Sequence, residues 1–243
     1  RSRPVSQASA TTTATLHDLK KLSGGVWMVQ LKPLTSYSYC AGQFTELMVP
    51  GFTSLYYTIA SSPSSPCVEL HIQTGTDQAD ALIDHLKDTD SVELAPAGGD
   101  CRLEVLPEEN GPLLLIASGT GFSQVKSIVE DLLAQHTRRT IHLYWSGHRL
   151  SQLYMLQKAE NWADLHDNIH VSALISEHSH WDDKHQMLVH SILGDHSDLN
   201  QCQAICCGSP AMVYTVLDSL CSKGFRRDAM LSDVFMFAPR EAQ

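Results

Sequence analysis

The chain has 243 residues, a hydrophobic fraction of 43% and a formal net charge of −10 at pH 7. This length is enough for two modest domains, each with its own core. The acidic balance argues against nucleic acid and anionic membrane surfaces as partners, and no apolar run approaches the roughly 20 residues that a membrane-spanning helix needs.

The first part of the chain is expected to be a flexible lead-in followed by a small barrel. Residues 1–10 are rich in Ser and Ala and contain no apolar stretch, so they are expected to be flexible. Residues 11–108 hold six strand-like runs, separated by turn formers and interrupted by a helix-like stretch at 77–87. This series predicts a six-stranded antiparallel β-barrel. The runs are TTTATLHD (11–18), GVWMVQLK (25–32), QFTELMVP (43–50), SLYYTIAS (54–61), CVELHIQT (67–74) and SVELAPA (91–97).

The spacing of apolar residues changes after the linker-like segment 106–112, which combines Pro, Gly and acidic residues. Over residues 109–243, apolar runs typical of strands alternate with segments of helical spacing. This alternation predicts an α/β domain with a doubly wound parallel sheet and helices on both faces. The expected strands are 113–117, 140–146, 169–175 and 203–207, the expected helices are 123–135, 150–159, 184–193 and 211–222, and a last apolar segment covers 231–237.

Two glycines stand where the first of these strands turns into a helix, in the stretch SGTG (118–121). The N–H groups at the start of a helix lack internal partners and the helix dipole is positive there, so a phosphate fits this place. On these residues alone, a tight turn that needs glycine and binds nothing is an equal alternative. In the helix that follows, Val125 and Ile128 lie on the apolar side, whereas Lys126 and Glu130 are expected on the other side.

Ligands of doubly wound sheets bind at the carboxyl ends of the strands. This rule brings four turns of the chain to one edge of the predicted sheet. The turns are 118–122, 146–149, the loop after 175, and 207–210. The sequence therefore predicts that any ligand site of the second domain lies at this edge.

The seven cysteines form no recognisable disulfide or metal pattern. An odd number scattered over a chain of this size is typical of reduced thiols, which predicts a cytoplasmic protein. Cys202, Cys206, Cys207 and Cys221 match neither zinc nor iron–sulfur spacings. The loop 177–185 holds three histidines, but two of them are only two residues apart and share no helical face, so a solvated loop without a metal is expected.

A family resemblance rests on seven segments that together are specific in order and spacing. They are YCAGQF (39–44), YYTIAS (56–61), VELHI (68–72), ASGTGFSQVKSI (117–128), LYWSGH with the following LY (143–154), CCGSPAMV (206–213) and SDVFMFAP (232–239). The chain thereby resembles the ferredoxin–NADP reductase superfamily over nearly its whole length from about residue 11. It is most similar to the bacterial NAD(P)H:flavin oxidoreductases, including the type found with luciferase genes.

The resemblance implies a barrel that binds FAD or FMN and an α/β domain that binds NADH or NADPH. Hydride would pass from the nicotinamide to the flavin, with Thr58 near the flavin N5 atom and Cys207 beside the nicotinamide as the catalytic residues. The implied flavin contacts are Tyr56, Tyr57, Thr58, Ala60, Ser61, His71, Gln73, Gly75 and Thr76, and the implied nucleotide contacts are Ser118, Gly119, Thr120, Gly121, Phe122, His148, Arg149, Cys207, Gly208, Ser209 and Pro210. Without the motifs, Tyr57 is also readable as an ordinary strand residue and Cys207 as a small core residue.

Two departures from the family pattern concern the flavin phosphates. Leu55 stands where the flavin motif normally carries an Arg that pairs with a phosphate, which Leu cannot do. The helix start that normally holds further phosphates is also poorly matched, with Gly75 and Thr76 as the only candidates. Both changes predict weak retention of flavin, as in an enzyme that uses flavin as a diffusing substrate, a degenerate site, or a site with other contacts.

Three interpretations of function follow from the sequence. The leading one is an oxidoreductase that passes hydride from NAD(P)H to a free flavin. A variant is the reductase component of a system that passes electrons on to an acceptor protein, such as an iron–sulfur protein or an oxygenase. The alternative is a non-catalytic binding protein of the same fold with a degenerate flavin site, for which the substitution at Leu55 is the argument.

Overall fold

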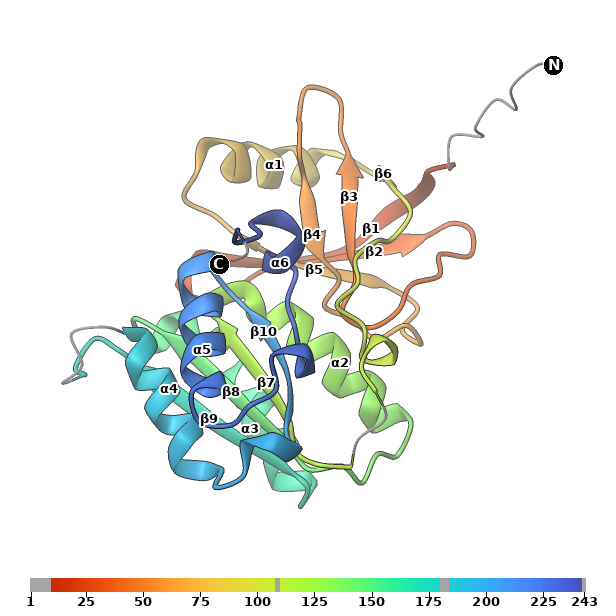
Figure 1. Ribbon diagram of the computed structural model, residues 1–243. Coiled ribbons are helices and arrows are strands. Elements are labelled where there is room, and N and C mark those ends of the chain that lie inside the picture. Colours follow the sequence, from red (N-terminus) through yellow and green to blue (C-terminus); the bar gives the residue numbers. More distant parts are fainter. Residues whose placement is uncertain (1–9, 108–109, 180–183, 242–243) are drawn as a thin grey trace.

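The structure is a computed structural model that describes residues 10–107, 110–179 and 184–241. Its two halves, an antiparallel sheet and a parallel sheet with helices, pack against each other (Figure 1). This arrangement confirms the fold class predicted from the sequence. The predicted lead-in at 1–10 lies almost entirely outside the described residues. The predicted boundary between 108 and 109 also lies outside them, so the division into domains at that point stays a prediction.

The first half is a six-stranded antiparallel sheet with the order β4-β3-β6-β1-β2-β5. The chain just after β4, at one end of this order, meets β5 at the other end, because the Ala60 N–H donates to the Glu69 carbonyl at 2.7 Å, and the sheet therefore closes into a barrel. Aliphatic side chains fill its interior, and α1 covers one end with Leu82 and Leu86. The elements are β1 (Thr12–Lys21), β2 (Val26–Pro33), β3 (Phe44–Met48), β4 (Tyr56–Thr58), β5 (Val68–Gln73), α1 (Asp77–Asp88) and β6 (Ser91–Leu94).

The second half is a five-stranded parallel sheet with the order β11-β10-β7-β8-β9. Helices α2 and α3 pack on one face and α4 and α5 on the other. The strand order reverses between β7 and β10, which is the switch point at which doubly wound sheets bind ligands. The elements are β7 (Leu113–Ser118), α2 (Phe122–Ala134), β8 (Ile141–Gly147), α3 (Leu156–Leu165), β9 (Ile169–Ile175), α4 (Lys184–Asp195), β10 (Gln203–Cys207), α5 (Pro210–Cys221), β11 (Met230–Leu231) and α6 (Val234–Phe237).

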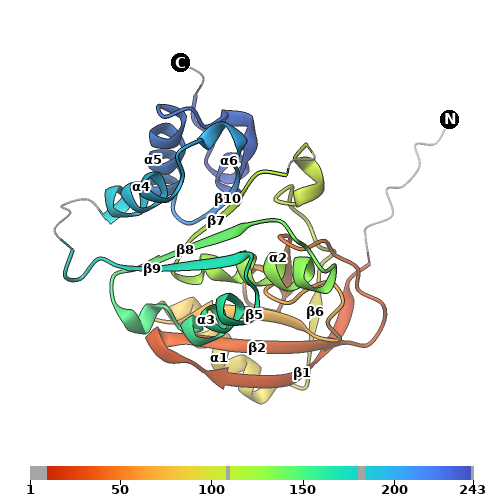
Figure 2. The ribbon, with the colours of Figure 1, turned by 90° about the horizontal axis from the view of Figure 1, so that it is seen from below.

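Helix α2 lies between the parallel sheet and the barrel (Figure 2). Residues Phe122–Val129 are consequently buried on every side, including the side of the helix on which the sequence places Lys126. The side opposite the apolar residues, on which Lys126 was expected, is therefore covered by the barrel at this residue. No helix in the described parts of the chain is long and apolar enough to cross a bilayer.

Two predicted elements of the second half differ in kind from those of the structure. The helix expected at 150–159 is a single 3-10 turn at Leu150–Gln152 followed by α3, since the Gln152 side chain accepts the N–H groups of His148 and Arg149 and holds a turn there. The segment 231–237 divides into the end of β11 and the short helix α6, because the carbonyls of Ser232 and Asp233 accept backbone N–H groups from the residues that follow.

Candidate functional site

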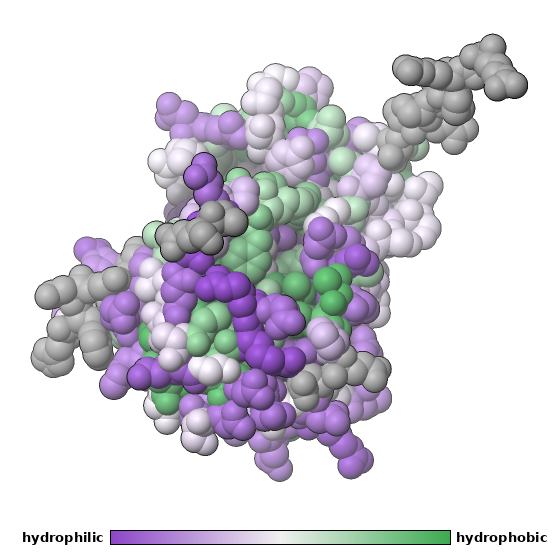
Figure 3. All heavy atoms as spheres, in the orientation of Figure 1, coloured by the Kyte–Doolittle hydropathy of each residue, from purple (hydrophilic) through white to green (hydrophobic). Residues whose placement is uncertain are grey.

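A cleft of about 550 Å³ lies where the barrel meets the carboxyl edge of the parallel sheet. Strands β4 and β5 form its barrel side, the turns after β7 and β10 form the opposite side, and residues 232–237 form a third. Apolar side chains gather around α6 on this face of the molecule (Figure 3). The predicted site residues that line the cleft are Tyr56, Tyr57, Thr58, His71, Gln73, Ser118, Thr120, Gly121, Cys207, Gly208 and Ser209.

A smaller hollow of about 140 Å³ continues from the glycine turn across the carboxyl ends of β8 and β9. Gly119 and His148 line it, and Ser118 lines both spaces. The two spaces thus form one path that begins at β4 of the barrel and runs past the switch point of the sheet. An elongated ligand such as a dinucleotide fits a path of this kind.

The remaining predicted residues line neither space. Phe122 has no exposed surface, so its side chain does not reach either space. Pro210 is the first residue of α5. Arg149 lies at the surface, where its side chain pairs with the carboxylate of Glu177 in the loop after β9. The predicted site residues that line neither space are Ala60, Ser61, Gly75, Thr76, Phe122, Arg149 and Pro210.

Thr58 and Cys207 face the cleft from the barrel and from the sheet respectively. The Cys207 thiol is nearly buried and donates a hydrogen bond to Gln124 Oε1 at 2.7 Å. Burial raises the pKa of the Cys207 thiol, so the group stays protonated and acts as a small polarizable donor. The Thr58 hydroxyl both donates and accepts hydrogen bonds and can therefore face a ring nitrogen in either protonation state.

Sequence reasoning missed Gln124 and Asp233, both of which line the cleft. Gln124 Nε2 donates to the Gly42 carbonyl at 2.6 Å and to Asp233 Oδ2 at 3.1 Å, so one amide ties α2, the barrel and the α6 segment together. Burial raises the pKa of Asp233, and the hydrogen bond from Gln124, which by itself lowers the pKa, only partly offsets this effect. For Gln124, the available signal was the concentration of polar residues around Val125 in SQVKS (123–127), at the start of the helix.

The glycine turn has the features of an anion cradle. Gly119 has φ +53° and a Cβ there would meet nothing within 4 Å, whereas a Cβ on Gly121 would lie 2.4 Å from the Cys207 carbonyl oxygen. Gly119 is therefore needed for the turn and leaves open space above it, while Gly121 is needed for packing against β10. The N–H of Phe122, the first residue of α2, donates to carbonyls of the preceding 3-10 turn Gly119–Gly121. No side chain of the described residues caps this turn, so the N–H groups of the turn itself fit the diphosphate of a nicotinamide nucleotide.

The barrel side fits a flavin ring but not a flavin phosphate. Leu55 is 1% exposed and packs inside the barrel core, which corrects the expectation that position 55 faces a phosphate. At the start of α1, Thr76 accepts the Ala79 N–H and Asp80 accepts the Gly75 N–H. These N–H groups are satisfied internally, and Asp77 adds a second carboxylate to the first turn, so this end repels a phosphate.

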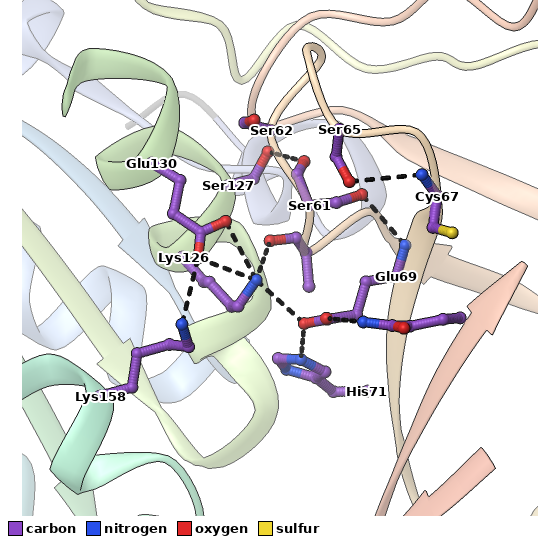
Figure 4. Close-up of polar contacts among 12 residues, drawn as sticks. Ser61, Ser62, Ser65, Cys67, Glu69, His71, Lys126, Ser127, Glu130 and Lys158 are labelled. Carbon is purple, nitrogen blue, oxygen red and sulfur yellow. Dashed lines mark hydrogen bonds and ion pairs between the residues drawn. The ribbon is translucent and has the colours of Figure 1, made fainter. Parts of the chain in front are cut away.

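A buried network of charged groups joins the barrel to α2 (Figure 4). Lys126 Nζ lies 3.1 Å from Glu69 Oε2 on β5 and 3.0 Å from Glu130 Oε1 one turn along its own helix. Glu69 also accepts hydrogen bonds from His71 at 2.7 Å and from Gln30 at 3.1 Å. Burial alone would raise the pKa of Glu69, but the His71 hydrogen bond and the Lys126 charge lower it to about 2, so the carboxylate stays ionised.

The same network reaches the glycine turn through stacked rings. The second ring nitrogen of His71, Nδ1, lies 2.7 Å from the Tyr154 hydroxyl. The His71 ring also lies parallel to Phe122, which stacks on Trp145 with ring centroids 3.9 Å apart. Trp145 Nε1 donates to the Gly119 carbonyl at 3.0 Å. The ion pair, the cleft wall and the glycine turn are therefore parts of one packed unit.

Lys126→Met is expected to lower the free energy of unfolding by about 3–5 kcal/mol, because it leaves the buried Glu69 carboxylate without its cation. Lys126→Arg keeps the charge, and Lys126→Met combined with Glu69→Gln removes both charges, so each of these is expected to retain most of the stability. Urea unfolding at pH 7 measures the differences.

The matched control is Lys158→Met, which removes an exposed cation 3.7 Å from the other carboxylate of the network, Glu130. It is expected to change the free energy of unfolding by less than about 1 kcal/mol. A Lys126→Met variant as stable as this control would show that the buried pair does not hold the two halves together.

The described part of the chain contains no group of three or more His, Cys, Asp or Glu side chains placed to hold a metal ion. The loop 177–185, expected to be solvated, lies partly outside that region.

Comparisons with known proteins agree with this geometry. Residues 115–218 match the family model of the oxidoreductase NAD-binding domain. A probable flavin reductase of Aliivibrio fischeri is 27% identical over 227 residues, which are 90% of this chain and 95% of that protein. The CDP-6-deoxy-L-threo-D-glycero-4-hexulose-3-dehydrase reductase of Yersinia pestis is 29% identical over 215 residues, which are 86% of this chain but only 63% of that protein.

The chain thus spans less than two thirds of the length of some relatives that it matches. Among solved structures, the ferredoxin-NADP+ reductase of Plasmodium falciparum superposes with a TM-score of 0.77 at 18% identity, over 91% of this chain and 95% of that one, which shows a shared fold. The matches thus agree with the architecture: residues 115–218 match an oxidoreductase NAD-binding domain, the chain is similar to flavin reductases over nearly its whole length, and it shares the fold of a ferredoxin-NADP+ reductase.

Proposed function

We propose that the protein is an oxidoreductase that transfers a hydride from NADH or NADPH to a flavin. The observation that carries the proposal is a single cleft in which Tyr57 and Thr58 of the barrel face the glycine turn and Cys207 of the parallel sheet. Hydride transfer needs two rings held face to face at a distance of roughly 3–3.5 Å between the reacting atoms. A cleft between a ring-binding barrel wall and a nucleotide-binding edge supports that arrangement.

The nicotinamide supplies the hydride and the flavin accepts it, so the chain's own task is positioning. The half-buried Tyr57 offers its ring as a wall for the flavin. Thr58 orients the ring by a hydrogen bond, and the Cys207 thiol, fixed by Gln124, fills the space beside the nicotinamide. The glycine turn before α2 holds the diphosphate away from the reacting rings.

A free flavin as the substrate is favoured over a permanently bound one. The two places expected to hold flavin phosphates contain the buried Leu55 and the internally capped, acidic start of α1. A flavin held by its ring alone exchanges readily with solvent. The relative named as a probable flavin reductase matches over nearly its whole length, which supports the same interpretation.

A second candidate is a reductase component that delivers electrons to an acceptor protein. The specific observation in its favour is an exposed apolar rim on the cleft, where Tyr56 is 52% and Phe237 61% exposed. Exposed aromatic groups of this kind are frequent at protein contacts. The relative from Yersinia pestis, named as a dehydrase reductase, is the precedent.

A cytoplasmic location is proposed with either function. All seven cysteines are free thiols, four of them buried. Thiols persist in this state in reducing compartments. The nucleotides that the cleft fits are also metabolites of such compartments.

Riboflavin is expected to be reduced almost as well as FMN, with kcat/KM values within about fivefold of each other, because the described residues that line the cleft include no Arg or Lys to pair with the phosphate. Steady-state oxidation of NADH and NADPH, followed with riboflavin, FMN and FAD in turn, measures this. FMN preferred by more than about tenfold, or a flavin that stays bound through gel filtration, would contradict the free-flavin assignment. The absence of nucleotide oxidation with every flavin would support the non-catalytic alternative.

Gly119→Asn is expected to raise the KM for the nicotinamide nucleotide by roughly tenfold, since the new side chain projects into the space left for the diphosphate. Asn tolerates the left-handed backbone conformation of this position better than other side chains, so the turn itself survives. Gly224→Asn is the matched control, because Gly224 also has positive φ, also has open space at its Cβ and lines neither part of the site. Equal KM values in the two variants would remove the glycine turn from the site.

A further inference from the structure

The short helix α6 lies between two hollows of the molecule. Asp233 and Phe237 line the cleft on one side of this segment. Phe235 and Pro239 line a second hollow of about 960 Å³, whose other lining residues come largely from α5. Val234 is buried, whereas Phe237 is exposed. Because a hollow lies behind this wall of the cleft, packing alone leaves α6 room to move, and its position depends on how its ends are tied.

The chain that follows α6 is fastened to α5 by two side chains one helical turn apart. Arg240 Nη1 and Nη2 donate to the two carboxylate oxygens of Asp218 at 2.6 and 2.9 Å. The Arg240 guanidinium also lies over the ring of Tyr214, with its Cζ atom 4.2 Å from the ring centroid. The Tyr214 hydroxyl donates to the Ala238 carbonyl at 2.7 Å and accepts the Arg240 N–H at 3.2 Å. We call these four residues, Tyr214, Asp218, Ala238 and Arg240, the C-terminal latch.

The geometry of the latch makes its ion pair stronger than most exposed pairs, which contribute little. Two parallel hydrogen bonds join the guanidinium to the carboxylate, and the guanidinium also stacks on an aromatic ring. The hydrogen bond from Arg240 holds the pKa of Asp218 below its ordinary value, so the carboxylate is ionised at neutral pH. Both side chains are partly exposed, so salt is expected to weaken the pair.

The cleft side of α6 contacts the barrel. The Phe237 ring lies 5.7 Å from that of Phe44 on β3, and Phe44 lies edge to face with Tyr56 on β4 at 5.9 Å, both measured between ring centroids. Figure 1 shows α6 next to these strands. Asp233, just before the helix, accepts a hydrogen bond from Gln124 of α2 at 3.1 Å. Movement of α6 therefore opens the wall of the cleft beside β4.

We propose that Asp218 and Arg240 are positioning residues for the flavin, which act by holding α6 against the barrel. The inference rests on the proposed function and adds to it a pair of residues that do not line the cleft. A flavin bound mainly by its ring depends on the walls that enclose the ring. When α6 is in place for only a fraction of the time, the apparent affinity for the flavin falls in proportion to that fraction.

The first measurement is riboflavin binding without nucleotide, with the dissociation constant taken from quenching of the flavin fluorescence. Arg240→Gln and Asp218→Asn are each expected to raise this constant by about fivefold at low salt. The double variant Asp218→Asn/Arg240→Gln is expected to show no further rise, because either change alone breaks the pair. High salt is expected to shrink the effect. A rise in the double variant equal to the product of the two single rises would overturn the pair as the cause.

Steady-state kinetics distinguish positioning from damage to the whole site. In both single variants the KM for riboflavin is expected to rise by the same factor as the dissociation constant. The kcat and the KM for the nicotinamide nucleotide are expected to stay unchanged, because the flavin that reacts is bound with α6 in place. A fall in kcat with an unchanged riboflavin KM would overturn the proposal.

The matched control is Arg227→Gln, which removes another cation from the same carboxylate. Arg227 Nη2 lies 3.4 Å from Asp218 Oδ1, its side chain is exposed, and it lies before β11 and not in the chain that follows α6. This variant is expected to leave the riboflavin dissociation constant unchanged. An equal rise in Arg227→Gln and Arg240→Gln would overturn the proposal in favour of a general effect of charge.

Hydrogen exchange tests the latch without any flavin. In Arg240→Gln the backbone amides of residues 234–240 are expected to exchange faster than in the wild type, while those of α2 stay unchanged. Unchanged exchange at 234–240 would overturn the latch, and faster exchange with an unchanged riboflavin affinity would overturn its role in flavin binding. Failure of the wild type to bind riboflavin would instead contradict the proposed function and with it that role, whereas the exchange result would still report on the latch itself.

Discussion

The contact on which the rest of the structure depends is the ion pair of Lys126 with Glu69. A charged amine is costly to bury unless carboxylates and hydrogen bonds surround it, so the barrel and α2 have to meet in the one arrangement that satisfies it. Once they do, His71 forms part of the cleft wall, and its neighbours Phe122 and Trp145 hold the glycine turn in place. The cleft is therefore a consequence of how the two halves are joined, and not a property of either half.

The way in which the two halves are joined explains why the barrel and the parallel sheet contribute different kinds of groups to the site. The barrel presents the ring of Tyr57 and the hydroxyl of Thr58, and the described barrel residues that line the cleft include no Arg or Lys for a phosphate. The parallel sheet presents the glycine turn and the thiol of Cys207, which suit a diphosphate and a planar ring. The groups that suit a phosphate thus lie on the side of the parallel sheet. This agrees with the proposal that the nucleotide is bound through its diphosphate whereas the flavin exchanges with solvent.

Much of the fold was predictable because strands buried on both faces read as continuous apolar runs. The strand at 203–207, which is buried along its whole length, has the expected bounds for this reason. The side chains that depend on contacts between distant elements were not predictable. Helical periodicity placed Lys126 opposite the apolar side of the helix but contains no information about the barrel that covers it. The motif around Leu55 identified the strand but not the direction of that side chain. Gln124 and Asp233 carried no motif, since their role arises only where α2 meets the α6 segment.

The central claim is that the flavin and the nicotinamide meet in the cleft between β4 and the ends of β7 and β10. The most direct measurement is a crystal structure of the protein grown with riboflavin and NAD⁺. The expected result is a flavin ring against Tyr57 and Thr58, the diphosphate at Gly119, and the nicotinamide ring in contact with the flavin beside Cys207. A flavin bound outside this cleft, or a nucleotide whose diphosphate does not reach the glycine turn, would contradict the account.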